Sequence, residues 1–225
     1  MSSTLIKTFQ RLYKKIQLIL QESKTNLQEI SQSLTTIQQL CERLDLLINN
    51  GEDATSVLGI LTHFQGIPSA LKSEHLRQLE LLTSFCFLSL SELEDNSSKL
   101  GEICTTAFDT YEINAQVLNI NDCLEASAAT PSIATMLEWF DWLHRAQIEQ
   151  QAHVTSVMDE LKLFITQVTT GDNLQADDMD NMGNMGMAEK FSGWQAVLLA
   201  SELNEKKVMM MEAIMTSRVP SFITL

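Results

Sequence analysis

Apolar residues recur at alternating steps of four and three along the first fifty positions of the chain. From residue 9 to residue 48 only one member of this series is polar; the members are Phe9, Tyr13, Ile16, Leu20, Ser23, Leu27, Ile30, Leu34, Ile37, Cys41, Leu44 and Ile48. Such a repeat predicts one long helix, over about 3–49, with a continuous apolar seam. The seam either packs entirely within the chain or extends in part as a coiled coil with another subunit.

Two more long helices are expected further along. The Gly66-Ile67-Pro68 break ends a connector over 52–70, which has a possible short helix at 54–64, and a helical apolar stripe then runs over 70–117. A polar stretch at 95–98 and Gly101 would permit a kink in this helix. The next helix is predicted over 131–170, because Thr130 suits the N-cap and Pro131 suits the first helical position.

The last part of the chain changes character. Residues 171–190 are acidic, rich in Gly and Met, and lack periodicity, so they read as a flexible linker before a final helix at 191–218. No segment alternates apolar and polar residues as a strand would. Only 3 Pro and 8 Gly in 225 residues also argue against a turn-rich fold. The sequence therefore predicts an all-α fold, an elongated antiparallel bundle of about four long helices with coiled-coil-like packing.

The charge narrows the range of functions. The formal net charge is −14; residues 1–50 have a net charge of +2, and residues 51–225 have a net charge of −16. An acidic surface disfavours direct binding to nucleic acid or to anionic membrane, both of which require clustered cations. The four cysteines are far apart and contain no CxxC pair, and the chain has enough apolar material to fold without disulfides. We expect reduced thiols and a cytoplasmic and/or nuclear protein.

No residues converge on a recognisable catalytic pattern. The chain has no Gly-rich phosphate loop, no HExxH and no GxSxG, and its four histidines are not spaced as helical metal ligands. Asp178, Asp180, Gly183 and Glu189 fit four positions of a calcium loop, but Met182 at a fifth offers no oxygen. We therefore expect no enzyme activity, no cofactor and no bound metal, although a small-ligand carrier or an enzyme using the bundle interior is the alternative from another class.

Two tryptophans of the third helix lie away from its apolar stripe. At 100° per residue, Trp142 lies about 180° and Trp139 about 240° from Ile133, which marks the stripe. Either this helix is central and packs against two neighbours of its own chain, or the tryptophans form part of a partner interface, where Trp is enriched. Glu138 and Met136 belong to the same candidate interface.

A short signature makes the sequence more specific than its class. Tyr111-Glu112, then Pro131-Ser132-Ile133-Ala134 and Met136-Leu137-Glu138-Trp139, resemble the central signature of the AIRIM family of small helical ribosome-maturation factors. The order of elements is also similar, with Ile67-Pro68 and Leu71-Lys72 opening the second helix. The resemblance covers roughly residues 5–168, with a looser match over 208–222.

The resemblance implies a non-enzymatic adaptor. Family members associate with a Cdc48-like AAA+ ATPase and with a second small helical subunit similar to a cyclin-dependent-kinase-interacting protein, in an assembly that acts on pre-60S particles. It supplies no catalytic residues; only Pro131, Ser132, Met136, Leu137, Glu138 and Trp139 carry over, as structural or interface positions. The stretch after Trp139 lacks the basic character expected of the family, so contact with the particle would be indirect. A coiled-coil cytoskeletal or kinetochore-type subunit is the alternative.

Overall fold

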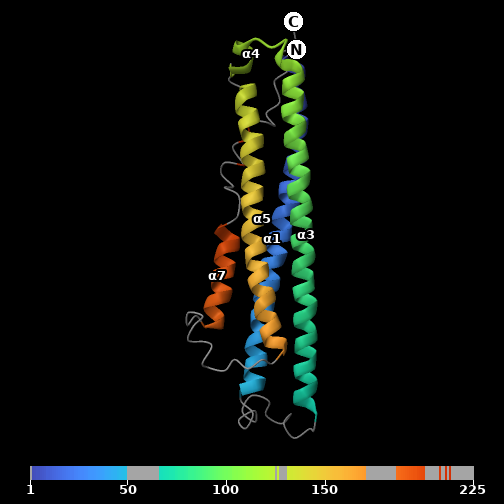
Figure 1. The fold of residues 1–225 in the computed structure, drawn as a ribbon, viewed down its shortest axis with the longest axis vertical. Helices are drawn as coiled ribbons and strands as arrows, with labels where there is room; N and C mark the ends of the chain where they lie inside the picture. The colour runs from blue at the N-terminus through green and yellow to red at the C-terminus, as the bar shows by residue number, and fades with distance from the viewer. Residues whose placement is uncertain are drawn as a thin grey trace. The chain divides into compact units, whose positions relative to one another are not determined.

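The computed structural model describes residues 2–49, 66–124, 126, 131–170 and 186–200, together with 208, 211 and 213. Its helices are α1 (Ser2–Asn49), α3 (Ile67–Ala115), the short α4 (Ile120–Leu124), α5 (Ile133–Thr170) and α7 (Met187–Ala200) (Figure 1). Every regular element within these residues is a helix, which confirms the all-α prediction. None of the described helices is long and apolar enough to cross a membrane.

The helices form two compact units, and α1, α3 and α5 each contribute a segment to both. Unit 1 comprises Met1–Thr25, Glu92–Ala152 and Ser201–Leu225, whereas unit 2 comprises Asn26–Ser91 and His153–Ala200. Within unit 1, α3 runs antiparallel to α1 and α5. The contacts establish this direction, because Phe9 and Cys104 both meet Phe140, whereas Ser23 meets Asn96 and Gln147.

The seam predicted on α1 is buried within the chain's own units. Ten of its members from residue 9 to residue 44 are at most 5% exposed; they are Phe9, Tyr13, Ile16, Ser23, Leu27, Ile30, Leu34, Ile37, Cys41 and Leu44. Leu20 is partly buried against the core of unit 1, and the side chain of Ile48 lies outside the described residues. The seam thus packs inside the chain, one of the two arrangements that the repeat allowed.

The core of unit 1 is a single apolar cluster built from the start of α1, the end of α3 and the start of α5. Phe9 and Phe140 pack edge to face with ring centroids 5.7 Å apart, a favourable arrangement for aromatic pairs. Met211 is fully buried in the same cluster. The hydroxyl of Tyr13 donates a hydrogen bond to the backbone oxygen of Val208, 3.4 Å away.

Unit 1 also contains a layer of buried polar residues, outside its apolar cluster. Ser23, the one polar member of the α1 seam, is 1% exposed. Its Oγ accepts hydrogen bonds from Nδ2 of Asn96 and Nε2 of Gln147, both at 3.4 Å. Asn96 also accepts a hydrogen bond from Nζ of Lys99. The polar residue in the repeat is therefore matched by polar residues on α3 and α5, as burial of polar groups requires.

Unit 2 contains an aromatic cluster between α5 and α7. The rings of Phe164, Phe191 and Trp194 pack edge to face, with centroid separations between 4.9 and 6.1 Å. The indole Nε1 of Trp194 donates a hydrogen bond to Oε2 of Glu160 at 2.7 Å. These contacts dock α7 beside α5 (Figure 1).

Several predicted boundaries differ from the observed ones. Residues 187–190, expected in the linker, belong to α7, because the carboxylate of Glu189 caps the helix start through the backbone N–H of Gly186. Helix α3 is continuous through the polar stretch at 95–98. It spans Ile67–Ala115, whereas the expected bounds were 70 and 117. The possible helix at 54–64, linker residues 171–185 and most of the predicted 191–218 helix beyond residue 200 lie outside the described residues.

The close approach of α5 explains why a glycine, Gly101, interrupts the apolar stripe of α3. A Cβ atom added at this position would lie 2.9 Å from Nε2 of His144 on α5. The residue therefore serves close approach of two helices of unit 1, and helix α3 continues through it.

Candidate functional site

The start of α5 is fixed by Ser132. Its side-chain oxygen accepts a hydrogen bond from the backbone N–H of Thr135 at 3.1 Å, and the backbone N–H of Met136 bonds to the backbone oxygen of Ser132. These bonds identify Ser132 as the N-cap, so α5 begins at Ile133. The prediction that placed Thr130 at the cap and Pro131 in the helix was wrong by two residues, because the Ser132 hydroxyl satisfies the exposed N–H groups.

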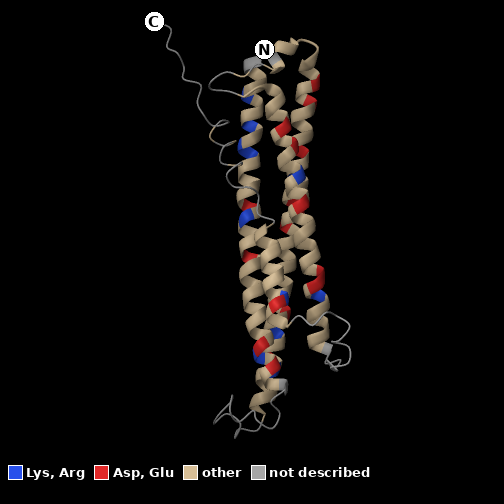
Figure 2. Cartoon of the chain, turned by 90° about the vertical axis from the view of Figure 1, so that its left-hand side faces the viewer, with Lys and Arg blue, Asp and Glu red and all other residues tan. Residues whose placement is uncertain are grey.

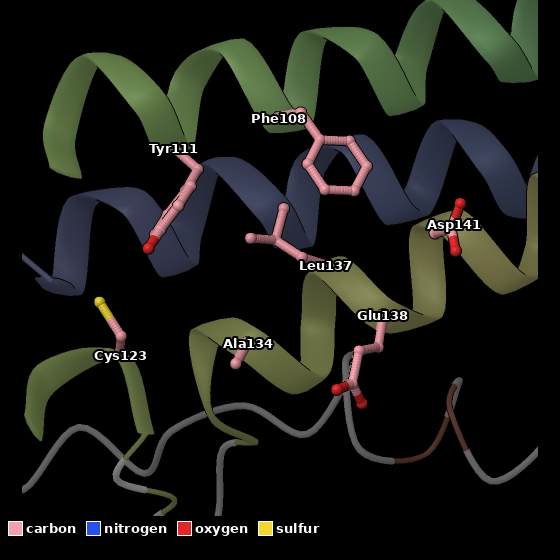
Figure 3. Close-up of a pocket in the computed structure, with 7 residues that line it drawn as sticks. All are labelled: Phe108, Tyr111, Cys123, Ala134, Leu137, Glu138 and Asp141. Atoms are coloured by element: carbon pink, nitrogen blue, oxygen red, sulfur yellow. The ribbon is translucent and has the colours of Figure 1, made fainter. Parts of the chain in front are cut away.

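A surface hollow lies beside this helix start, within unit 1. It has a volume of about 350 Å³ and is lined by Phe108 and Tyr111 of α3, Cys123 of α4, and Ala134, Leu137, Glu138 and Asp141 of α5. Figure 3 shows Phe108 and Tyr111 extending from α3 on the side that faces Leu137 on α5. Helices α3, α4 and α5, which are separate in the sequence, thus line one site.

The α3 side of the hollow is joined to α4 by a polar contact. A side-chain hydrogen bond between Tyr111 and Cys123 raises the pKa of the Tyr111 phenol above its ordinary value. In Figure 3 the Tyr111 oxygen and the Cys123 sulfur are on the same side of the hollow. The phenol is protonated at neutral pH, and its contact with Cys123 links α3 to α4.

The α5 side of the hollow carries the charge. Asp141 forms an ion pair with Arg145 one helical turn later. Glu138 is exposed and has no ion pair with any cation among the described residues. Two carboxylates therefore flank Leu137 on a site whose other walls are largely apolar.

The residues predicted for a partner interface fall into two groups. Glu138 lines the hollow, together with the signature residues Tyr111 and Leu137. Trp139 and Trp142 are instead partly buried and pack against the core of unit 1, and Met136 is fully buried inside that core. Helical geometry accounts for part of the division, because Glu138 and Trp139 point about 100° apart, whereas Trp142 lies only about 40° from Glu138.

The remaining signature residues have less direct roles. Ser132 is the N-cap, Pro131 directly precedes it and is partly buried, and Glu112 is exposed on α3 next to Tyr111. The signature therefore contributes a helix start and two walls of the hollow.

Sequence reasoning missed three residues of the hollow, namely Phe108, Cys123 and Asp141. A signal was present for two of them, because Phe108 lies three residues before Tyr111 and Asp141 lies four residues after Leu137. Cys123 lies on α4, between the helices predicted over 70–117 and 131–170, and no periodicity marks it.

Other reactive groups do not form a second centre in the described part of the chain. No three His, Cys, Asp or Glu side chains among the described residues gather closely enough to hold a metal ion. Cys41, Cys86, Cys104 and Cys123 are all free. Burial raises the pKa of Cys41 and Cys104 to about 12 and that of Cys86 to about 11. Three of the thiols are therefore protonated at neutral pH and act as small apolar core residues. The candidate calcium loop at 178–189 lies mostly outside the described residues.

Comparison with known proteins supplies the family. No protein of curated function gives a significant match to the chain. The family model described as CA109-like, "Ribosome biogenesis protein C1orf109-like", matches residues 3–193. This range contains most of the chain and includes α1, α3, α5, every residue of the hollow and the signature that resembled the AIRIM family, so that resemblance is confirmed. The chain belongs to the C1orf109-like family of ribosome biogenesis proteins.

Proposed function

We propose that this chain is a non-enzymatic adaptor subunit of an AAA+ ATPase complex that acts in maturation of the large ribosomal subunit. It would contact a second small helical subunit, similar to a cyclin-dependent-kinase-interacting protein, and reach pre-60S particles through proteins. Family membership supports the role in ribosome biogenesis. The ATPase, the second subunit and the pre-60S particle come from the resemblance of the signature residues.

One observation carries the adaptor role: unit 1 exposes large apolar side chains beside the hollow. On α4, Ile120 is 70% exposed and Leu124 is 63% exposed, and both lie on the short helix that supplies Cys123 to the hollow. Burial of such side chains by a partner stabilises a complex by roughly 25 cal/mol per Å² of apolar surface. An apolar surface rimmed by polar groups is typical of a protein-binding site.

The distribution of charge supports contact with proteins. Figure 2 marks positions of Asp and Glu, in red, along the helices. The net charge of −14 disfavours a general grip on phosphate backbones. Glu138, Trp139 and Trp142 remain the proposed contact residues, and Met136 supports them from the core.

Affinity purification of the tagged full chain, followed by mass spectrometry, tests the proposal. We expect recovery of an AAA+ ATPase, a second small helical protein and ribosome-assembly factors. A chain with Ile120→Ser and Leu124→Ser should recover less of these proteins, whereas Leu199→Ser, an exposed leucine of unit 2, serves as the matched control. Recovery of neither an AAA+ ATPase nor ribosome-assembly factors by the native chain would refute the adaptor role.

The tryptophans need a separate measurement, because they also pack against the core of unit 1. If they contact a partner, Trp142→Ala lowers recovery of the second subunit while the melting temperature of the isolated chain is retained. A large fall in melting temperature would assign Trp142 to internal packing.

A further inference from the structure

The size and lining of the hollow restrict what it can bind. A volume of about 350 Å³ is at the lower end for pockets that enclose small molecules, which span roughly 300–1,000 Å³. Its lining contains no Lys, Arg or His, so it offers no cation to a phosphate or carboxylate ligand. The walls formed by Phe108, Ala134 and Leu137 suit a single bulky apolar side chain.

The carboxylates of Glu138 and Asp141 set a second requirement for the group that the hollow binds. Leu137 and Asp141 are four residues apart on α5, which corresponds to a separation of about 6 Å along the helix. Glu138 is exposed beside them and has no ion pair with a described cation. A Lys or Arg side chain can lay its methylene stem on an apolar wall and place its charged end against such carboxylates.

We propose that the hollow binds a basic segment of a partner protein through one bulky hydrophobic side chain and a nearby Arg or Lys. The apolar side chain enters between Phe108 and Leu137, and the cation meets Glu138, because Asp141 is already paired with Arg145. The negative charge of the chain favours such a partner over an acidic one. The assignment rests on the proposed adaptor function and gives its partner a defined chemistry.

The test uses a random dodecapeptide library displayed on phage and selected on the immobilised full chain. A parallel selection uses Phe108→Ala, and a third uses Phe85→Ala, whose phenylalanine also lies on α3 and has almost the same exposure, 41% against 39%. We expect the native chain and Phe85→Ala to enrich peptides that combine Leu, Phe or Trp with a nearby Arg or Lys. Phe108→Ala should lose this enrichment.

The charge requirement is tested with one enriched peptide, labelled with fluorescein and titrated with each protein by anisotropy. We expect about tenfold weaker binding for Phe108→Ala, because the solvent-accessible part of an aromatic ring is buried on binding. Glu138→Gln should weaken binding about threefold or more, whereas Glu149→Gln, an exposed glutamate elsewhere on α5, should leave it unchanged. Circular dichroism of each variant checks that its helix content is intact.

Several outcomes would overturn the proposal. These are no enrichment on the native chain, equal enrichment on Phe108→Ala, and enrichment of acidic peptides. Concentration-dependent dimerisation that Phe108→Ala abolishes would identify a second copy of the chain as the occupant instead. None of these results bears on recovery of the ATPase and assembly factors in the purification experiment, so failure of the hollow and failure of the adaptor role are distinguishable.

Discussion

Replacing Ser23 with alanine should destabilise the fold although it removes only one oxygen atom. Ser23 Oγ is the acceptor for two buried amide donors, Nδ2 of Asn96 and Nε2 of Gln147. Without it both N–H groups lose that partner in a site closed to water. A buried donor left unpaired costs about 1–3 kcal/mol. Because both bonds are 3.4 Å long and hence weak, we take about 1 kcal/mol for each and expect a loss of about 2 kcal/mol.

Gln147 should respond in the opposite direction. Its Oε1 is buried and has no hydrogen-bond partner among the described residues. Gln147→Leu removes this unpaired acceptor and sacrifices only one long hydrogen bond, while it nearly conserves side-chain volume. We expect the unfolding free energy to be unchanged or to rise by about 1 kcal/mol.

Urea unfolding followed by far-UV circular dichroism measures both changes. Ser84→Ala is the matched control, because Ser84 is exposed and its hydroxyl bonds only to a backbone oxygen of its own helix. It should shift the unfolding free energy by no more than about 0.5 kcal/mol. The reasoning is refuted if Ser23→Ala is as stable as the native chain, or if Gln147→Leu is the more destabilising of the two.

Two further predictions concern the packing of unit 2 and the state of the thiols. Trp194→Ala should lower the unfolding free energy by about 3–5 kcal/mol, because it opens a cavity beside Phe164 and Phe191 and removes the hydrogen-bond donor to Glu160. Urea unfolding measures this loss, and Val197→Ala, at an exposed position of the same helix, is the control. Equal losses for the two variants would contradict the prediction. At pH 8 a thiol reagent should modify one cysteine per chain rapidly, since burial raises the pKa of Cys41, Cys86 and Cys104 to about 11–12 and shields them, while Cys123 is only partly buried. Mass spectrometry of the modified chain locates the label, and rapid modification of any of the other three before unfolding would contradict the described burial.

The long helices could be predicted from sequence because their stabilising pattern is local. The α1 repeat from Phe9 to Leu44 predicts which residues of that helix are buried, because a helix presents every third or fourth residue to one side. The boundary of α5 was harder, because Thr130 and Ser132 are both good N-caps by type. The choice between them depends on which hydroxyl reaches a free N–H group, and here it is Ser132.

Features that depend on residues far apart could not be predicted. Ser23 was visible as an exception in the repeat, but its partners lie 73 and 124 residues away on other helices. Gly101 suggested a kink when considered alone, whereas in the fold it makes room for His144. The hollow likewise requires the end of α3, α4 and the start of α5 to meet. The signature identified part of it through Tyr111 and Leu137, yet the spacing of these two residues does not reveal a shared surface.

The negative charge of the chain and the apolar hollow should contribute to different stages of partner binding. Long-range attraction from a net charge of −14 raises the rate at which a basic partner is encountered. Salt reduces that rate, because at 0.1 M ionic strength charges more than about 10 Å apart are largely screened from each other. Burial of an apolar side chain between Phe108 and Leu137 acts only after contact and mainly slows dissociation. Charge alone would therefore select basic segments broadly, and the hollow would distinguish those that also carry a bulky apolar side chain at the right spacing.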